Sequence, residues 1–162
     1  MNITVRPYDQ SDKDDVIFCL ENLSDYLSPL DPFKKIRRLP PWGRKYMNWL
    51  LDKVKKQDGA IFVAQDENRI IGCIIVVVVK ISKLDQLSFA VSQMGRILEL
   101  FIYEKYRRRG AGRLLMNKAE EYLRMKKCEF IRIEVFEPNT RAHTFYQSLG
   151  YADRLRDMIK QI

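Results

Sequence analysis

Four arginines and two glycines are concentrated in one short stretch, YRRRGAGRLLM, at residues 106–116. The stretch joins an apolar run typical of a strand to one typical of a helix, so it is expected to open a helix. The first amides of a helix are unpaired donors that bind phosphate, and glycine allows the backbone to approach a ligand closely. Guanidinium groups add forked hydrogen bonds to phosphate oxygens. A pyrophosphate suits this stretch best, although the same pattern is typical of a basic loop capped by glycine. The residues concerned are Arg107, Arg108, Arg109, Arg113, Gly110 and Gly112.

Three other nucleotide-binding motifs do not match the sequence of this stretch. A Walker A loop needs Gly-Lys-Ser/Thr, whereas the chain has Gly112 followed by Arg113 and Leu114. A dinucleotide-binding fingerprint needs a third glycine where Leu115 stands. An RNA-binding sheet would carry its aromatic, basic and glycine residues within a strand, whereas these glycines begin a helix.

Composition predicts one globular domain over residues 1–162, with 46% hydrophobic and 31% charged residues. The longest apolar run, at 70–79, is too short to span a bilayer, and the N-terminus has no secretory leader pattern.

Three dispersed cysteines and a single histidine, His143, argue against a zinc site, so we expect no metal and a reducing cytoplasm. The net charge of +8 favours an anionic partner.

Apolar periodicity predicts the elements that position the glycine-arginine stretch. Residues 2–6 are expected to form a strand, and Ser11 with Asp14 resembles a capping box at the start of a helix that ends near Leu27. A second helix should end near Lys56. AIFVAQ and RIIGCIIVVVVK, separated by DEN, predict a β-hairpin whose second strand is covered on both faces.

The C-terminal half is expected to alternate strands and helices. The predicted elements are a strand at 96–103, a helix at 110–126, a strand FIRIEVF that contains Glu134, a short helix capped by Gly150, and a last strand within 151–162. The order β-α-α-β-β-β-α-β-α-β predicts a mixed α/β fold.

Two of these segments read together, ELFIYEKYRRRGAGRLLM and IEVFEPNTRAHTFYQSLGY, closely resemble the GNAT superfamily of acetyl-CoA-dependent N-acetyltransferases. In that family a strand leads into Q/R-x-x-G-x-G/A at the start of a helix, matched here by Arg107, Gly110 and Gly112. A later strand ends before N-x-x-A-x-x-F-Y-x-x-x-G-F/Y, matched by Asn139, Ala142, Phe145, Tyr146, Gly150 and Tyr151. The close match covers residues 96–151, and the element order outside it agrees. Arg108 and Arg109 depart from the frequent glycine and small or polar residue, which adds positive charge.

The resemblance implies a mostly antiparallel central sheet with a splayed strand pair and helices on both faces. It also implies that Leu100, Phe101 and Ile102 pair with the pantetheine arm of acetyl-CoA, with the amide of Ile102 as an oxyanion donor. Asn139 is expected to contact the cofactor as well. The pyrophosphate is expected on the backbone amides of one segment: Arg108, Arg109, Gly110, Ala111, Gly112 and Arg113.

Acetyl transfer to an amine requires a neutral amine and a proton for the leaving thiolate. The resemblance implies that Tyr146 lies near the CoA sulfur as a general acid, although its helical stripe with Phe145 and Leu149 also fits ordinary core packing.

The general base is open between two carboxylates. Glu134 matches the glutamate assigned as base in members that acetylate the N-termini of ribosomal proteins. Glu99 lies where other members carry an acidic residue that binds or deprotonates the amine. Either one could face solvent or pair with an arginine such as Arg96 or Arg132, and a water chain could replace both.

The resemblance therefore implies an N-acetyltransferase in which a primary amine attacks acetyl-CoA directly. The acceptor is open among a protein N-terminus, a lysine side chain, a polyamine, an aminoglycoside and a small metabolite. In this family the acceptor pocket is built by segments that correspond to residues 22–56 and 80–95, and dimers are common. Two alternatives are a non-catalytic CoA-sensing or partner-binding module and, from the positive charge, a nucleic-acid-binding protein.

Overall fold

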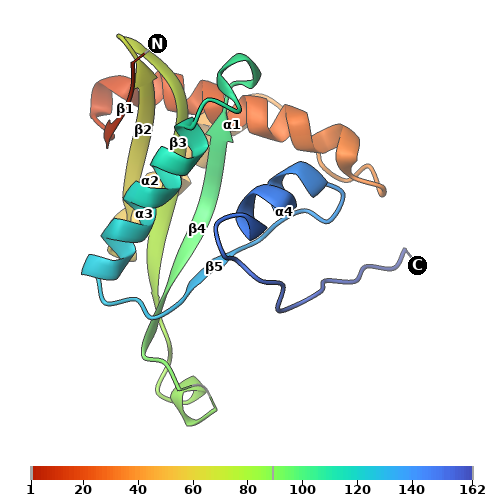
Figure 1. Cartoon of the computed structure of the whole chain (residues 1–162). Helices are drawn as coiled ribbons and strands as arrows, with labels where there is room; N and C mark the ends of the chain where they lie inside the picture. The colour runs from red at the N-terminus through yellow and green to blue at the C-terminus, as the bar shows by residue number, and fades with distance from the viewer. Residues whose placement is uncertain (1, 89, 162) are drawn as a thin grey trace.

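The computed structural model describes residues 2–88 and 90–161, and their strands form a five-stranded sheet with helices on both faces (Figure 1). The strands, in the order in which they lie side by side, are β1 (Ile3–Pro7), β2 (Ala60–Asp66), β3 (Arg69–Lys80), β4 (Gln93–Ile102) and β5 (Ile131–Ile133). The longer helices are α1 (Lys13–Leu27), α2 (Trp42–Lys56), α3 (Ala111–Met125) and α4 (Thr140–Gln147). The first four strands pair antiparallel, and β5 lies parallel to β4 after the α3 crossover.

The central strand β3 is an almost unbroken β-branched run that is buried on both faces, as its sequence predicts. One apolar layer lies between the sheet and α3 and α4, where Leu115 and Met116 are fully buried. The other lies between the sheet and α1 and α2, where Leu20 and Leu50 are fully buried (Figure 1). The predicted fold, a mostly antiparallel sheet covered on both faces, is confirmed.

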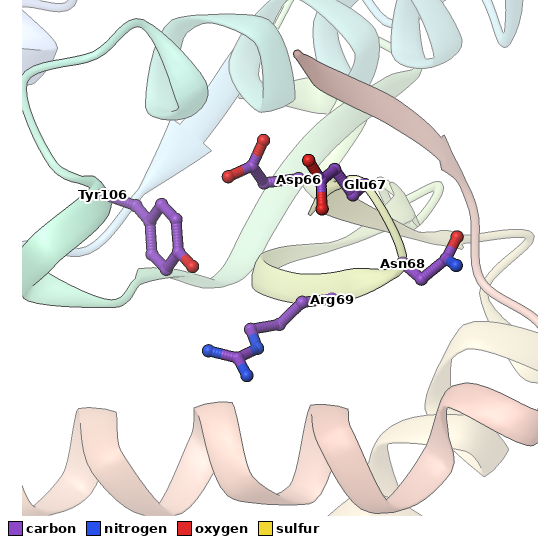
Figure 2. A pocket seen from close by; sticks show the side chains of 5 residues that line it. All are labelled: Asp66, Glu67, Asn68, Arg69 and Tyr106. Atoms are coloured by element: carbon purple, nitrogen blue, oxygen red, sulfur yellow. The ribbon is translucent and has the colours of Figure 1, made fainter. Parts of the chain in front are cut away.

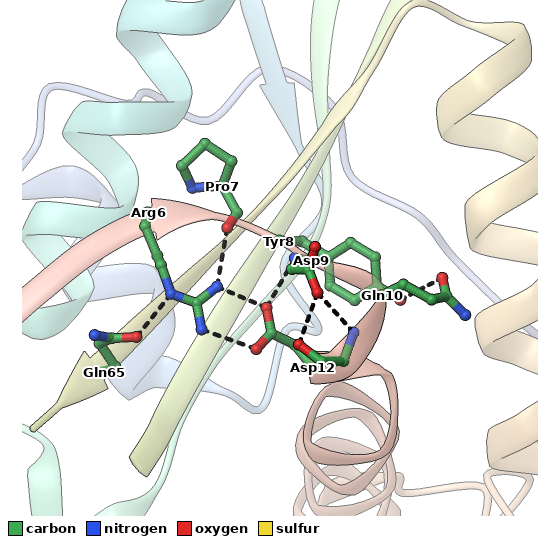
Figure 3. A network of polar contacts seen from close by, with 8 residues as sticks. Arg6, Pro7, Tyr8, Asp9, Gln10, Asp12 and Gln65 are labelled. Atoms are coloured by element: carbon green, nitrogen blue, oxygen red, sulfur yellow. Dashed lines mark hydrogen bonds and ion pairs between the residues drawn. The ribbon is translucent and has the colours of Figure 1, made fainter. Parts of the chain in front are cut away.

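An ion pair fastens the start of α1 to the first strand (Figure 3). Arg6 donates from Nη1 and Nη2 to the two carboxylate oxygens of Asp12, over 2.7 and 2.8 Å. It also donates from Nε to Gln65 Oε1 at 2.7 Å. The hydrogen bond from Arg6 lowers the pKa of the Asp12 carboxyl below its ordinary value, so the pair stays charged at neutral pH.

The capping box begins two residues earlier than predicted. Asp9 accepts the N–H of Ser11 at 2.9 Å, and Asp12 accepts the N–H of Asp9 at 2.8 Å. The predicted box at Ser11 and Asp14 is therefore wrong, because Ser11 already lies inside a short turn that Asp9 caps.

Strand β4 contains one additional residue in its middle. Ile75 pairs with Glu99, but the next residue, Val76, pairs with Ile97, which leaves Leu98 without a partner. A β-bulge of this kind breaks the regular alternation of side chains. Ile97 belongs to the layer under α3, whereas Glu99 pairs with Ile75, which belongs to the layer under α1 and α2. In a regular strand the side chains of Ile97 and Glu99 would lie on the same face of the sheet, under α3. The bulge therefore moves the Glu99 side chain to the opposite face, under α1 and α2.

Strand β5 leaves the sheet early. It pairs with β4 only at Gly95, Arg96 and Ile97, and no described residue continues the pairing along the outer edge of β4 to Ile102. The splayed strand pair that the resemblance implies is therefore present.

Two predictions for the C-terminal part are wrong. The strand predicted around FIRIEVF is limited to Ile131–Ile133, so Glu134 lies just beyond it. Residues 151–161 form no strand, and residue 162 lies outside the described residues. Leu155, Met158 and Ile159 are exposed, so the chain after Tyr151 buries no apolar face that would offset the entropy lost on ordering a strand.

No helix within the described residues is long and apolar enough to cross a bilayer. The same residues contain no group of three His, Cys, Asp or Glu side chains arranged to hold a metal ion. The three cysteines are free, with Cys19 and Cys73 buried.

Candidate active site

The turn before α3 has the features of an anion site. Gly110 is the N-cap of α3 with a φ of 86°, a left-handed conformation that strains any residue with a side chain. A Cβ at this position would meet no protein atom within 4 Å, so this side of the turn faces open space. Because no side chain caps the helix, the amides of its first turn remain available to a ligand. Three arginines of the turn and first helical residues are exposed: Arg108, Arg109 and Arg113.

Gly112, in the first turn of α3, lies where that helix meets α4. A Cβ added to Gly112 would lie 3.3 Å from Cζ of Phe145, closer than most real contacts of a Cβ. The glycine therefore allows the N-terminus of α3 to approach α4, which carries Tyr146.

The side chain of Arg107 binds the protein itself. Its Nε donates to the carbonyl oxygen of Ile102 at 2.8 Å, and its guanidinium carbon lies 4.9 Å from the ring centroid of Tyr26. Arg107 thus orders the end of β4 against α1, a role that the sequence does not indicate.

The outer edge of β4 offers backbone groups to a ligand. Tyr103 donates its N–H to Ile71 at 3.0 Å, and Phe101 pairs with Cys73 across the ladder. Since N–H groups of an antiparallel strand point alternately to its two edges, those of Leu100 and Ile102 point away from β3. They face the edge that β5 has left, which fits the predicted pairing of this segment with an extended ligand.

Glu99 and Tyr46 form a hydrogen-bonded pair on the wall of a small cavity between α1 and α2. The Tyr46 hydroxyl donates to Glu99 Oε1, and the Tyr46 ring stacks on Trp42 with centroids 4.7 Å apart. Burial raises the pKa of Glu99 above its usual value, and the hydrogen bond from Tyr46 partly opposes that shift. A buried carboxylate with a raised pKa is suited to accept a proton from an ammonium group. The cavity has a volume of about 130 Å³ and is also lined by Leu20, Leu23, Ser24, Leu27 and Ile36.

The raised pKa of Glu99 predicts how stability depends on pH. Between the ordinary value of 4.5 and the higher folded pKa, the folded protein holds a proton on Glu99 that the unfolded chain has released. The stability of the wild type relative to Glu99→Gln should be greatest below pH 4.5 and should fall by up to about 1.4 kcal/mol per pH unit above it. Urea unfolding of both proteins between pH 4 and 8 measures this difference. Glu134→Gln is the control, and a flat difference for Glu99→Gln would contradict the raised pKa.

Tyr146 combines a buried ring with an accessible hydroxyl. The side chain is 9% exposed, and its ring packs on Phe145 and Tyr151 with centroids 5.4 and 6.0 Å away. Within residues 2–88 and 90–161 the hydroxyl has no hydrogen-bond partner and is not fully buried, so a ligand can contact it. Burial raises the pKa of Tyr146 and the charge of Glu99 adds to that rise, so the two groups lie within electrostatic reach. The phenol therefore stays protonated and can donate to a ligand.

Asn139 is the N-cap of α4, where its Oδ1 accepts the N–H of Ala142 at 3.3 Å. The hydroxyl of Tyr26 lies 3.4 Å from the same oxygen. Because Arg107 stacks on Tyr26, this tyrosine links the two segments that carry the predicted site.

Glu134 lies in a different environment from Glu99. Its Oε1 pairs with Arg96 at 2.9 Å and with Arg132 at 3.1 Å, and its side chain is 59% exposed. Both arginines therefore hold the Glu134 carboxylate at the solvent-exposed surface, away from the cavity that Glu99 lines. Of the two predicted bases, Glu99 has the environment suited to the role.

A second hollow, about 430 Å³ in volume, lies at the turn between β2 and β3 (Figure 2). Its lining includes the carboxylates of Asp66 and Glu67, with Arg69 and Tyr106. The carboxylates would repel an anionic ligand, so this hollow is less suited to phosphate than the turn at Gly110.

Residues 21–151 match the model of the acetyltransferase (GNAT) family, a region that contains the turn at Gly110, Glu99 and Tyr146. The chain belongs to this family. Family membership supports acetyl transfer in general.

The GNAT chain is similar to other proteins named as N-acetyltransferases. An uncharacterised N-acetyltransferase of Methanocaldococcus jannaschii is 27% identical over 113 residues, which are 70% of this chain and 46% of that protein. The chain thus matches less than half the length of this relative. An N-alpha-acetyltransferase of Sulfurisphaera tokodaii is 28% identical over 130 residues, 78% of this chain and 77% of the relative.

Solved structures support the GNAT fold. A Bacillus halodurans protein solved as a tetramutant has a TM-score of 0.82 at 20% identity, covering 98% of this chain and 99% of that one. AAC(6')-Iy, solved in complex with the bisubstrate analogue CoA-S-monomethyl-acetylneamine, has a TM-score of 0.75 at 14% identity, covering 100% and 99%. At these identities the likeness establishes the fold alone.

Two tyrosines of the GNAT chain were missed as site residues by sequence reasoning. The sequence places Tyr46 on the apolar stripe of the second helix, in a group with Trp42 and Trp49 that either packs this helix or lines the acceptor entrance. Its contact with Glu99 depends on the bulge at Leu98 and could not be predicted. Tyr26 carried no motif signal, so the sequence does not indicate its contacts with Arg107 and Asn139.

Proposed function

We propose that the protein transfers an acetyl group from acetyl-CoA to a primary amine by direct attack of the amine. The observation that supports this most is the free edge of β4, which runs from Glu99 to the residues before the Gly110 turn. It joins backbone donors, a carboxylate with a raised pKa and uncapped helix amides in one continuous segment.

Each residue would have a defined part in the reaction. Acetyl-CoA, when bound, supplies a thioester carbonyl and a thiolate leaving group. The amides of the Gly110 turn would bind the pyrophosphate, and the edge at Leu100 and Ile102 would orient the pantetheine arm. The amide of Ile102 would donate to the carbonyl oxygen.

Two side chains would move the protons. Glu99 would accept a proton from the attacking amine on the carboxylate oxygen that Tyr46 does not occupy. The Tyr146 hydroxyl would give its proton to the thiolate, since its raised pKa keeps it protonated. The N-alpha-acetyltransferase name of the Sulfurisphaera tokodaii relative and the CoA-containing analogue bound to AAC(6')-Iy agree with this donor and this class of acceptor.

Replacing Gly110 by alanine tests the cofactor site. The Cβ would strain the left-handed turn by about 1 kcal/mol and would occupy the open space where the pyrophosphate is expected. We expect the Kd for acetyl-CoA, measured by isothermal titration calorimetry, to rise about 10- to 100-fold through the loss of a charge-assisted hydrogen bond.

Gly150→Ala is the matched control, since Gly150 has a φ of 91° and also faces open space. It should lose similar stability but keep its affinity for acetyl-CoA. Equal affinities of wild type and Gly110→Ala, or no binding by the wild type, would overturn the proposed cofactor site. Binding without thiol release for any amine would favour a CoA-sensing module instead.

A further inference from the structure

The cavity beside Glu99 restricts the chemistry of the acceptor. At about 130 Å³ it is similar in size to an apolar cavity of roughly 150 Å³ that holds benzene, so it can hold one aliphatic side chain. Its walls are formed mainly by leucine, isoleucine and tryptophan side chains of α1, α2 and the segment between them. Ser24, Tyr46 and Glu99 are its polar side chains, so a sugar or polyamine would bury more hydroxyl or amino groups there than these three can bind, which is costly.

The polar groups of the cavity suit a single amine. Glu99 is its one carboxylate, and Tyr46 already donates to one of the two carboxylate oxygens. The stacked rings of Trp42 and Tyr46, tilted by 17°, form a flat wall next to it. The cavity therefore fits an amine whose carbon bears an apolar substituent.

The segment that joins α1 to α2 places positive charge beside this cavity. The carboxylate of Asp31 accepts the backbone N–H groups of Phe33, Lys35 and Ile36, which fixes the course of the segment. Ile36 lines the cavity, while its neighbours Lys35 and Arg37 are exposed.

Lys34 and Arg37 keep their charge unbalanced. Arg38 is paired with Asp25 and Glu21, at 2.8 and 3.5 Å. Among residues 2–88 and 90–161, no carboxylate forms an ion pair with Lys34 or Arg37, and both are exposed. Lys35 lies within electrostatic reach of the Asp31 carboxylate, so Lys34 and Arg37 carry the surplus positive charge. This basic rim, consisting of Lys34, Lys35 and Arg37, would attract negative charge on the part of the acceptor that remains outside the cavity.

We propose that the acceptor is the N-terminal amine of a polypeptide whose first residue is apolar and whose next residues are acidic. The inference rests on the proposed acetyl transfer and deepens it. A free apolar amino acid is disfavoured because its carboxylate would lie next to the amine, close to the carboxylate of Glu99. In a peptide that position is an uncharged amide, and acidic side chains farther along can reach the basic rim.

Thiol release from acetyl-CoA with a set of matched peptides tests the proposal. The set is Leu-Asp-Glu, Leu-Ala-Ala, Leu-Lys-Lys and Gly-Asp-Glu on a common neutral tail, together with free leucine. At low salt we expect kcat/KM for Leu-Asp-Glu to exceed that for Leu-Lys-Lys about tenfold, with a smaller ratio at high salt. Leu-Asp-Glu should also exceed Gly-Asp-Glu about tenfold, because the glycine leaves the cavity unfilled.

Reversing the charge of the basic rim provides a second test of the acceptor proposal. The double variant Lys34→Glu with Arg37→Glu should remove the preference for acidic peptides, whereas Lys83→Glu with Lys127→Glu should keep it. The control lysines belong to the segment between β3 and β4 and to the end of α3, away from the segment between α1 and α2 (Figure 1). An unchanged Kd for acetyl-CoA in both variants shows that they are folded.

The outcomes separate the two proposals. Equal kcat/KM for all peptides, a preference for Leu-Lys-Lys, or a preference for free leucine or another small amine would overturn the acceptor class while acetyl transfer stands. No thiol release with any amine would overturn acetyl transfer itself, and the acceptor class with it.

Discussion

Glu99→Gln is expected to lower kcat for amine acetylation by about 10²- to 10⁴-fold, the range of general acid–base catalysis. Glutamine has the same shape and can accept the hydrogen bond of Tyr46, but it cannot take a proton from the amine. The wild-type kcat should rise with pH through the raised pKa of Glu99, and this limb should be absent from the variant. A thiol-release assay at saturating amine between pH 5 and 9 measures both effects.

Glu134→Gln provides the comparison for this result. Because Glu134 is exposed and held by Arg96 and Arg132, its loss should change kcat by less than about threefold. A large loss in Glu134→Gln with little change in Glu99→Gln would reverse the assignment of the base.

Tyr146→Phe is expected to lower kcat by about 10²- to 10³-fold while the Kd for acetyl-CoA changes little. The phenylalanine ring keeps the packing against Phe145 and Tyr151, so only the hydroxyl is removed. Without it the thiolate must leave unprotonated or take its proton from water. Single-turnover kinetics with a saturating amine measure the chemical step directly.

Tyr151→Phe is the matched control for the loss of a hydroxyl on a neighbouring ring. Its hydroxyl bonds Glu120 at 3.0 Å, so its removal should lower stability slightly and leave kcat unchanged. Equal kcat values for wild type and Tyr146→Phe would reduce Tyr146 to a packing residue.

Most of the fold could be predicted from the sequence because its elements carry strong periodic signals. The β-branched run of β3 and the apolar stripes of the helices correspond to the two buried layers. The glycine turn at Gly110 was also predicted, since only glycine adopts its backbone conformation without strain. The strand predicted within 151–162 was wrong, because Leu155, Met158 and Ile159 find no surface to cover.

The choice between Glu99 and Glu134 could not be made from the sequence. Strand alternation assigns Glu99 to the face of Ile97, under α3, and nothing in the letters ELFI indicates an extra residue at Leu98. The register of β4 against β3, which is a long-range property, turns Glu99 toward Tyr46. Likewise, the two ion pairs of Glu134 depend on how far β5 runs beside β4.

The segment of β4 directly after the bulge has a consequence for how the protein tolerates change in its helices. In the proposed mechanism, the proton acceptor and the backbone donors that would meet the thioester belong to four successive positions of one chain segment, Glu99 to Ile102. The spacing of these groups along the chain is therefore fixed by covalent bonds. The shape of the cavity beside Glu99 depends instead on how α1 and α2 pack. Under the proposed mechanism, helix substitutions that keep Tyr46, the hydrogen-bond donor to Glu99, can reshape acceptor selectivity while the spacing of the reacting groups stays constant.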